Sequence, residues 1–491
     1  MEALEQLIEQ RVAKLEAVRK TGADPYQTPF QRDGSIREFL EPFKEGRKVR
    51  AAGRLTALRG QGKIAFGDLH DQSGKIQLFF SEEFLKERYA QVKETLDLGD
   101  IVGIEGECFK SKTGEPTIRV ERWALLSKAL RPPPEKFHGL QNQETKYRKR
   151  YLDLMANPET RATFELRSKL TAGIRRFLDG KGFIEVETPM MQLIPGGAAG
   201  KPFKTHHNAL GLDLFLRIAP ELYLKRLLVG GFDKVYELNR NFRNEGLSTR
   251  HNPEFTMLEV YESYGSCASM MELTEEMVTS LAQGLKGTAE LDFGGKKIDL
   301  KRPWKRVSLA ELLKKECGVS PTDPIDKMAE KLLARKGHKG TLEDGRGQKK
   351  VSRMQIANIV LDLLDEIPVT EAGAPTFVTE FFEIFSPLAK SLPGKPGVAD
   401  RFELYIGGME IANAYTELND PIEQKKRFES YKEIGGEEAK TVDMDFVEAL
   451  EYGMPPAGGL GIGIDRLAML LTGKETIRDV ILFPTLKPDT Q

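Results

Sequence analysis

A short stretch of the chain gathers charged and aromatic side chains between two runs that read as β-strands, KVYELNRNFR and FTMLEVYESY. Within sixteen residues the sequence places Arg240, Arg243, Glu245, Arg250, His251, Glu254 and Phe255. A hairpin tip often carries charge only for solubility. The strands favour a functional site instead, because residues two apart on an extended chain share a face. That spacing groups Arg243 with Glu245, and Glu259 with Tyr261.

A glycine-rich run at 458–471 leads into an apolar helix that begins at Asp465 and Arg466. The free N–H groups of a helix N-terminus attract phosphate, and an arginine in the first turn adds positive charge. The alternative is a tight packing joint, for which glycine is equally suited. A third run, GFIEVETPMM (182–191), ends a strand at Pro189. Alone it indicates only a sheet edge or corner.

Several signatures of nucleotide binding and catalysis are absent from the sequence. It contains no GxxxxGK[ST] or GxSxG, and the glycines near residue 460 lack the third position of the dinucleotide fingerprint. A nucleotide would therefore be bound by side chains on a sheet. The three scattered cysteines, Cys108, Cys267 and Cys317, offer neither a disulfide framework nor zinc ligands. We predict no zinc and a reducing compartment.

The charge balance and the termini narrow the class of protein. Lysine and arginine total 73 against 74 aspartates and glutamates, so a polyanion would have to meet a local basic surface. The N-terminus lacks the basic and apolar regions of a signal peptide. No apolar run approaches the roughly 18–20 residues that span a bilayer. We expect a cytoplasmic protein with no membrane segment.

The order of expected elements predicts more than one domain. Residues 1–45 begin with a helix, in which aliphatic residues recur at helical spacing. Residues 46–128 contain five short β-rich runs separated by glycine-containing turns, which predicts a small barrel of the OB-fold type. Residues 129–152 read as a linker that is stiffened by three consecutive prolines and carries a basic group at Lys146–Arg150.

Residues 153–491 interleave helices with long strands. Helices are expected at 160–181, 220–230, 268–286 and 421–434. Long strands with few short crossover units favour an antiparallel sheet flanked by helices, an α+β fold, over a doubly wound parallel sheet. Residues 318–350 carry no functional motif and read as a mobile surface insertion.

Together the three segments resemble the signature motifs of class II aminoacyl-tRNA synthetases, with the Pro189 strand as motif 1, Phe242–Glu245 as motif 2 and Gly459–Arg466 as motif 3. The motif regions lie near 182–191, 235–261 and 458–471. The closest resemblance is to the lysyl-tRNA synthetases of that class. It is carried by the runs THHNALGLDLFLRIAPELYLKRLLVGGFDKVYELNRNFRNEG, RHNPEFTMLE, ANAYTELNDP, ALEYGMPP and GLGIGIDR, and it covers nearly the whole chain.

The resemblance implies that lysine attacks the α-phosphorus of ATP and then passes to the 3′ end of tRNA(Lys). A carboxylate nucleophile is already ionised at pH 7, so catalysis would come from positioning and charge stabilisation. By resemblance, Arg243 bridges the lysine carboxylate and the α-phosphate, while Arg466 clamps the triphosphate and lies across the adenine. Glu245 reads the adenine edge, Phe255 stacks on the ring and His251 lies near the terminal phosphates.

The resemblance also implies a set of lysine ligands, namely Gly197, Glu221, Glu259, Tyr261, Asn413 and Glu417. Glu417 and Tyr261 would bind the side-chain amine, Glu221 and Gly197 the α-amine, and Asn413 the carboxylate. Glu259 would support these ligands. Which of Glu221 and Glu417 binds which amine stays open. Carboxylates are required because an unmatched buried ammonium would cost several kcal/mol to desolvate.

Glu403 and Glu410 resemble the carboxylates that bind Mg²⁺ in this family. Water and phosphate oxygens of ATP would complete the octahedral shell of the metal. The chain reads EIANAYTEL where many bacterial relatives have EIGNGFSEL, which places Tyr415 at the position of a phenylalanine. The same form occurs in eukaryotic members, and we interpret it as variation in the lining of the pocket.

The resemblance extends to the predicted barrel and to assembly. Phe66, Gln77 and Phe79 are expected to stack on and read unpaired anticodon bases, and Glu115 to read a uridine edge. An aromatic residue on a barrel strand is often a core residue instead. The basic group Lys146–Arg150 either follows the tRNA backbone or forms a solvated face. The family also implies a homodimer through the motif 1 region.

Three alternatives remain at this point. An aspartyl- or asparaginyl-tRNA synthetase would share the architecture but would need a cation in its pocket, where this sequence offers glutamates. A paralogue that attaches lysine to a protein typically lacks the N-terminal barrel. A catalytically inactive regulator would not be expected to keep all three motifs.

Overall fold

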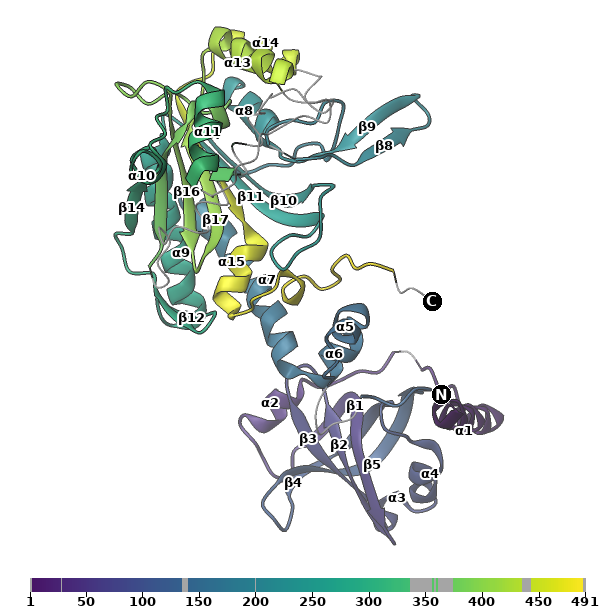
Figure 1. Cartoon of the computed structure of the whole chain (residues 1–491). Helices are drawn as coiled ribbons and strands as arrows, with labels where there is room; N and C mark the ends of the chain where they lie inside the picture. Colours follow the sequence, from purple (N-terminus) through teal and green to yellow (C-terminus); the bar gives the residue numbers. More distant parts are fainter. Residues whose placement is uncertain are drawn as a thin grey trace. The chain divides into compact units, whose positions relative to one another are not determined.

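The computed structural model describes residues 2–27, 29–134, 140–198, 200–335, 356, 359–360, 374–434 and 443–488. The chain folds into two compact units (Figure 1). The first comprises Met1–Asn142 and Tyr151–Ala156, and the second comprises Gln143–Arg150 and Asn157–Gln491.

The first unit is built around a closed barrel of five strands. In barrel order these are β1 (Lys48–Gln61), β2 (Ile64–His70), β3 (Lys75–Ser81), β5 (Pro116–Ser127) and β4 (Ile101–Lys110). β3 and β5 pair parallel, and the other neighbours pair antiparallel. Alternate side chains point inward, so Ala65, Ile76, Leu78 and Phe80 lie in the core. The predicted five-stranded barrel is confirmed.

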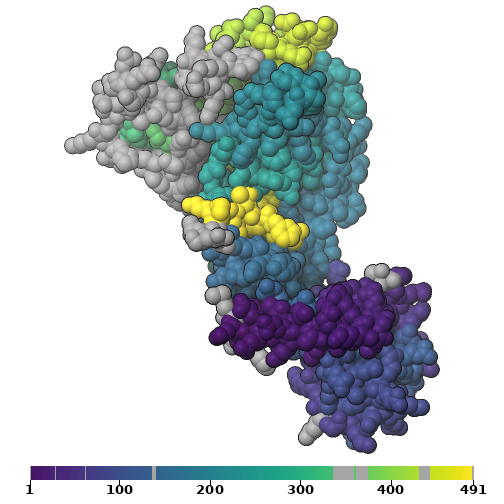
Figure 2. All heavy atoms as spheres, turned by 90° about the vertical axis from the view of Figure 1, so that its right-hand side faces the viewer, coloured from purple at the N-terminus to yellow at the C-terminus, as the bar shows by residue number. Residues whose placement is uncertain are grey.

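Among the described residues before Ser127, four helices accompany the barrel. They are α1 (Glu2–Lys20), α2 (Ile36–Leu40), α3 (Glu82–Leu85) and α4 (Arg88–Thr95). α1 lies on the surface of this unit, where it appears in dark purple in Figure 2. Two of its side chains attach it: Arg11 donates to the carbonyl of Ala129 at 2.8 Å, and Lys14 forms an ion pair with Asp97 at 2.7 Å.

The segment predicted as a linker, 129–152, is partly helical. Beyond residues 135–139, which lie outside the described part of the chain, it forms α5 (Gln143–Arg148) and begins α6 (Arg150–Ala156). Arg150 is buried in the second unit and donates to three backbone carbonyls of the segment 478–482. Because its guanidinium is engaged there, Arg150 stabilises the fold and does not lie on the solvated face that the basic group was predicted to form.

The second unit contains an eight-stranded sheet. In sheet order the strands are β14 (Lys305–Ser308), β15 (Thr376–Phe382), β16 (Val398–Ile406), β17 (Met409–Thr416), β18 (Ala457–Gly463), β11 (Glu254–Ser263), β10 (Lys234–Phe242) and β6 (Ile184–Glu185). The six central strands pair antiparallel, and the edge strands β14 and β6 pair parallel with their neighbours. The prediction of an antiparallel sheet is confirmed.

Three helices cover one face of this sheet, namely α7 (Pro158–Gly180), α9 (Cys267–Lys286) and α15 (Ile464–Thr472). Leu258 and Val260 of β11 and Leu460 and Ile462 of β18 join the apolar sides of these helices in one core cluster. Successive residues of a strand point to opposite faces. The residues between these aliphatic side chains therefore point to the other face, which carries the candidate site.

The remaining elements surround the sheet. β7 (Met191–Gln192), β9 (Leu212–Leu216) and β8 (Lys204–His207) form a small sheet, and β12 (Glu290–Phe293) pairs with β13 (Lys296–Asp299). The further helices are α8 (Glu221–Val229), α10 (Leu309–Cys317), α11 (Ile325–Arg335), α13 (Pro421–Ile434) and α14 (Met444–Glu451), with short 3₁₀ turns at Glu383–Phe385 and Ile477–Asp479. The four helices expected from periodicity correspond to α7, α8, α9 and α13.

Two expectations for this unit differ from the structure. The strand expected to end at Pro189 is only the two-residue edge strand β6, and Pro189 lies between β6 and β7, since proline cannot donate to a ladder. The region 318–350 was expected to be a mobile surface insertion. Its first part instead contains α11, which buries Met328, Ala329 and Leu332 in a core cluster. Residues 336–350 lie outside the described residues.

Within the described residues, no helix combines the length and the apolar character that crossing a membrane requires.

Candidate active site and nucleic-acid interface

The candidate active site lies on the sheet face that α7, α9 and α15 leave uncovered. Strand register aligns its residues in two rows. The tyrosine row consists of Arg401, Tyr415, Gly459 and Tyr261. The asparagine row consists of Glu403, Asn413, Gly461 and Glu259. Four predicted site residues thus share one face: Glu259 and Tyr261 of β11, and Glu403 and Asn413 of the consecutive strands β16 and β17, about 140 residues later.

An acidic pocket lies beside the tyrosine row, next to Tyr415 and Gly459. Glu221 begins α8, and Lys225 follows one turn later, with its Nζ 2.6 Å from Oε1 of Glu221. The same Nζ forms an ion pair with Oε2 of Glu417. The hydroxyl of Tyr415 donates to Oε1 of Glu221 at 2.6 Å. Lys225 and Glu417 are fully buried and Glu221 is 4% exposed, so this is an anionic site removed from water.

The third glutamate of the pocket pairs with a tyrosine of its own strand. Glu259 accepts a 2.9 Å hydrogen bond from the hydroxyl of Tyr261, as expected for residues two apart on β11. Burial, and next the charge of Glu221, raise the pKa of Glu259 to about 8. Burial raises the pKa of Glu417 well above its usual value, although the ammonium of Lys225 opposes the rise. A bound cation would stabilise the ionised form of both carboxyl groups.

Glycines provide the room in front of these carboxylates. A methyl group at Gly459 would lie 1.9 Å from Oε1 of Glu417 and 2.7 Å from the Tyr261 ring. Gly461 belongs to the asparagine row, and a methyl group there would lie 2.6 Å from Cε of Met257. Gly197 has a φ of 86° and packs against Glu221, so its backbone lies beside the pocket. The glycine motif thus serves as the floor of a pocket.

Arg243 lies where β10 ends, at the start of the charged loop. Its guanidinium covers the ring of Phe255 at 5.1 Å, and its Nε is buried without a hydrogen-bond partner among the described residues. Burial lowers the pKa of Arg243, while the charges of Glu245, Glu410 and Glu259 oppose this effect. The strand predicted over KVYELNRNFR ends one residue earlier, at Phe242, and the side chains of Arg243 and Glu245 both lie against Gly200.

A second cationic group lies at the start of α15. Arg466 is in the first turn of this helix, as predicted, and donates to the carbonyl of Glu410 at 2.8 Å and to its Oε2 at 3.2 Å. His251 is 3.0 Å from the same guanidinium through Nε2 and 2.8 Å from the Ser248 hydroxyl through Nδ1. Burial and the charge of Arg466 lower the pKa of His251, so the imidazole is neutral at pH 7.

The predicted metal ligands, Glu403 and Glu410, are near neighbours with different surroundings. Glu403 is buried, and its oxygens accept from Arg401 at 2.5 Å and from Tyr405 at 2.8 Å. Burial, opposed by Arg401, raises the pKa of Glu403 to about 7. Two carboxylates suit Mg²⁺ chemically but are too few for its shell. No group of three or more His, Cys, Asp or Glu residues that could hold a metal occurs in the described chain. The pair therefore fits a cation that arrives with phosphate oxygens.

The outer surface of the barrel carries the four residues predicted to contact an anticodon. Phe66 and Phe79 are cross-strand partners whose ring centroids lie 5.1 Å apart, and both are half-buried on the outer face of β2 and β3. They are therefore not core residues. Gln77 donates to Oε2 of Glu115 at 2.8 Å. Phe109, which the sequence reading missed, extends the aromatic surface with its ring 5.9 Å from Phe79.

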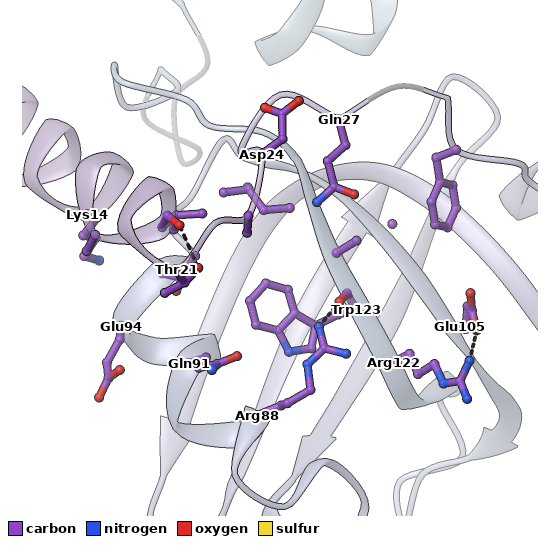
Figure 3. Close-up of a pocket in the computed structure, with 18 residues that line it drawn as sticks. Lys14, Thr21, Asp24, Gln27, Arg88, Gln91, Glu94, Glu105, Arg122 and Trp123 are labelled. Carbon is purple, nitrogen blue, oxygen red and sulfur yellow. Dashed lines mark hydrogen bonds and ion pairs between the residues drawn. The ribbon is translucent and has the colours of Figure 1, made fainter.

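A separate cavity of about 510 Å³ lies elsewhere in the first unit (Figure 3). Its wall includes the ring of Trp123, over which the guanidinium of Arg88 lies at 5.5 Å. The end of α1, with Lys14 and Thr21, borders it on another side. None of the four predicted anticodon residues lines this cavity. It is thus distinct from the aromatic surface.

Two residues of the candidate site were not predicted. Lys225 looks in the sequence like an ordinary i, i+4 partner of Glu221 on an exposed helix. Its burial depends on α14, whose Phe446 ring lies 5.8 Å from Nζ. Arg401 holds Oδ1 of Asn413 through Nε at 3.0 Å and contacts Glu403 through Nη2. Its alternation with Glu403 on β16 is the one sequence signal that could have identified it.

Comparison with known proteins agrees with this geometry. Residues 142–487 match the family of class II tRNA synthetases (D, K and N), and residues 49–126 match the OB-fold nucleic acid binding domain. The chain is 50% identical to a lysine–tRNA ligase of Pelotomaculum thermopropionicum, over 99% of this chain and 96% of the relative. It is 49% identical to a lysine–tRNA ligase of Carboxydothermus hydrogenoformans, over 99% of both chains. A lysine–tRNA ligase 2 of Methanosarcina acetivorans is 48% identical, over 97% of this chain and 93% of the relative. The chain therefore belongs to the lysyl-tRNA synthetases of class II.

Proposed function

We infer that this chain activates L-lysine with ATP to form lysyl-adenylate and pyrophosphate, and then transfers the lysyl group to the 3′ end of tRNA(Lys). The observation that carries this inference is the arrangement of three buried glutamates beside a glycine floor. Arg243 lies near enough to Glu259 for their charges to interact. A dicationic amino acid and an anionic phosphate could therefore be bound side by side.

The charge of the pocket supports lysine over aspartate or asparagine. Among the described residues, Glu221 and Glu417 share one ammonium partner, Lys225. The remaining negative charge would repel a second carboxylate and attract an ammonium. Glu417 and Tyr261 would bind the side-chain amine, while Glu221 and the backbone at Gly197 would bind the α-amine. The charge of Lys225 does not reverse this preference, because Glu221 and Glu417 share it.

The first chemical step requires orientation more than proton transfer. The attacking carboxylate of lysine would be held between Asn413 and Arg243, with Arg243 also bound to the α-phosphate. Charge that develops on the phosphate in the transition state would be stabilised by Arg243 and Arg466, whose guanidinium groups bind phosphate in a bidentate fashion. The pyrophosphate leaves on the side of Arg466. No base is needed because the nucleophile is ionised.

The nucleotide would be bound by the loop after β10 and by the start of α15. Adenine would stack on Phe255 and be read by Glu245, and neutral His251 would donate a hydrogen bond to the terminal phosphates. Magnesium that enters with ATP would be held by Glu403 and Glu410 and would neutralise phosphate charge. Arg466 would exchange its contact with Glu410 for the phosphates.

The barrel would bind the anticodon of tRNA(Lys). Phe66 and Phe79 offer outward ring faces for base stacking, and the bonded pair Gln77 and Glu115 offers hydrogen-bonding groups beside them. Phe109 would enlarge this surface. The outward orientation of these rings supports a role in anticodon binding, because an aromatic ring on the solvent-facing side of a strand is available to a ligand.

The chain would work as a cytoplasmic homodimer. Exposed apolar side chains in the motif 1 region support this assembly. Ile184, Met191 and Leu193 are 51%, 55% and 62% exposed. Apolar patches of this kind mark interfaces. Sedimentation or light scattering should give twice the 55.1 kDa mass of the chain.

The direct test of the activity is amino-acid-dependent exchange of pyrophosphate into ATP. We expect purified protein with Mg²⁺ to catalyse exchange with lysine, and aspartate and asparagine serve as controls of the same chemical step. Exchange driven by aspartate without lysine would rule out the assignment. Charging of tRNA(Lys) by the same preparation tests the second step and separates this function from lysine transfer to a protein.

A further inference from the structure

The acidic pocket contains an ammonium group of the protein itself. Lys225 is fully buried, and its Nζ contacts carboxylates from two elements, Glu221 of α8 and Glu417 after β17. The rings of Tyr415 and Phe446 lie 5.5 and 5.8 Å from the same nitrogen. Two carboxylates and two aromatic faces are the surroundings that an ammonium ligand requires. The chain thus supplies one cation to a pocket built for cations.

The charges around Lys225 can be counted from every element that packs against it. α8 contributes Glu221, and Arg226 of α8 is directed elsewhere, to Asp443 at 3.0 Å. β17 and the residue after it contribute Tyr415 and Glu417. β11 contributes Tyr261 and Glu259, both within electrostatic reach of Glu417. α14 contributes the uncharged ring of Phe446.

Three carboxyl groups lie around one ammonium group, that of Lys225, so the pocket can still accept ammonium groups from a ligand. The orientation of Glu417 fits this excess of carboxyl groups. Its Oε2 faces Lys225, while its Oε1 lies over Gly459 beside Tyr261. Apart from the ion pair with Lys225, the Glu417 carboxylate is buried without a hydrogen-bond donor among the described residues. One oxygen is therefore bound internally and the other is directed into the pocket.

We propose that Lys225 is a positioning and specificity-determining residue, whose ammonium is a permanent counter-ion that favours the ionised form of Glu417 and orients Glu221 and Glu417 toward the ammonium groups of the substrate. This inference rests on the proposed function, since it concerns how the same pocket selects lysine. The contrasting interpretation is that Lys225 only stabilises α8 by an i, i+4 ion pair. The two differ in what happens to the protons of the pocket when the ammonium is removed.

Lys225→Met removes the charge and keeps most of the side-chain volume. An opposite charge at this distance lowers a carboxyl pKa by about 1–3 pH units, so its loss should move the acidic limb of kcat/KM for lysine upward by about that amount. Below the limb, kcat/KM should fall about tenfold per pH unit, because one proton must leave before lysine binds. The KM for lysine should rise while the KM for ATP stays unchanged. Lys225→Arg, which keeps the charge, should retain the wild-type limb.

Lysine binding gives a second measurement that does not require turnover. Calorimetric titration in buffers of different ionisation enthalpy counts the protons released. Lys225→Met should release about one more proton per lysine at pH 7 than the wild type. An equal proton count, together with pH profiles that are parallel and only lowered, would overturn the proposal and leave the helix-stabilising role.

Control measurements separate the possible failures. If Lys225→Met does not fold, Lys225→Gln also removes the charge but keeps a hydrogen-bond donor for the carboxylates, and the same upward shift of the limb is expected. A limb at the wild-type position in this variant would contradict the proposal. A wild-type protein without lysine-dependent exchange would refute the proposed function itself. Wild-type exchange with an unshifted limb in Lys225→Met would refute only the role of Lys225.

Discussion

Replacing Gly459 with alanine should weaken the binding of lysine and spare the binding of ATP. The added methyl group would lie 1.9 Å from Oε1 of Glu417, whereas ordinary contacts of a Cβ atom begin near 3.4 Å. The carboxylate would have to retreat by the difference, about 1.5 Å. Gly459 pairs with Tyr261 on one side and Tyr415 on the other, so the strand itself has little freedom to move instead.

A retreat of that size takes the carboxylate out of hydrogen-bond reach of the substrate ammonium. A hydrogen bond to a charged group contributes about 1.5–3 kcal/mol, and each 1.4 kcal/mol is a factor of ten. The KM for lysine in pyrophosphate exchange should therefore rise about 10- to 150-fold. The KM for ATP should change little, because Phe255 and Arg466 are not touched by the methyl group.

Gly461→Ala is the matched control, on the same strand and the same face. Its methyl group would meet Cε of Met257 at 2.6 Å, and the end of a methionine side chain can move aside at small cost. We expect a smaller rise in the KM for lysine than for Gly459→Ala. An unchanged KM for lysine in a folded Gly459→Ala protein would show that Glu417 is not a lysine ligand, and the reasoning about the pocket floor would fail.

Three further predictions test other parts of the molecule. Arg243→Ala should lower kcat for exchange by about 10²–10³ while circular dichroism stays unchanged, since it removes charge from the transition state; near-normal exchange would show that motif 2 is misplaced. Glu259→Gln should raise the melting temperature more at pH 8.5 than at pH 5.5. Between pH 4.5 and about 8 the folded state holds a proton that the unfolded chain releases, so wild-type stability falls as pH rises through that window; a pH-independent difference would contradict this. Phe66→Ala should weaken tRNA charging by about 1–3 kcal/mol and leave exchange intact, as expected for a lost stacking surface. Ile64→Ala, at an exposed position of the same strand, is its control, and equal effects would argue against stacking.

Local patterns in the sequence were sufficient to predict the regular elements. α1 covers the helix expected from aliphatic spacing, and β10 and β11 coincide with the strands that flank the charged loop. The pairing of Glu259 with Tyr261 followed from the two-residue period of a strand alone. These features depend on neighbours in sequence, which is why they could be read without the fold.

Features that depend on contacts between distant segments could not be predicted in the same way. Lys225 is buried only because α8 packs beside β17 and α14, and no local pattern distinguishes it from a solvated lysine on a helix. Arg150 reads as part of a basic linker, yet its guanidinium is held by carbonyls more than three hundred residues away. The residues predicted to contact the anticodon lie on strands that the sequence predicts. However, only the closed barrel determines that Phe66 and Phe79 point outward.

The register of the central strands is what turns the motifs into a site. Along β11 and β18 the residues of the pocket alternate with Leu258, Val260, Leu460 and Ile462, all of which lie in the core under the helices. A shift of one residue between strand and neighbours would exchange the two sets. The carboxylate of Glu259 would then enter the apolar core, and aliphatic side chains would fill the space above the glycine floor. Burial of an unpaired charge is far more costly than any local preference of these strands, so the same aliphatic residues that stabilise the core also fix the position of the proposed lysine site.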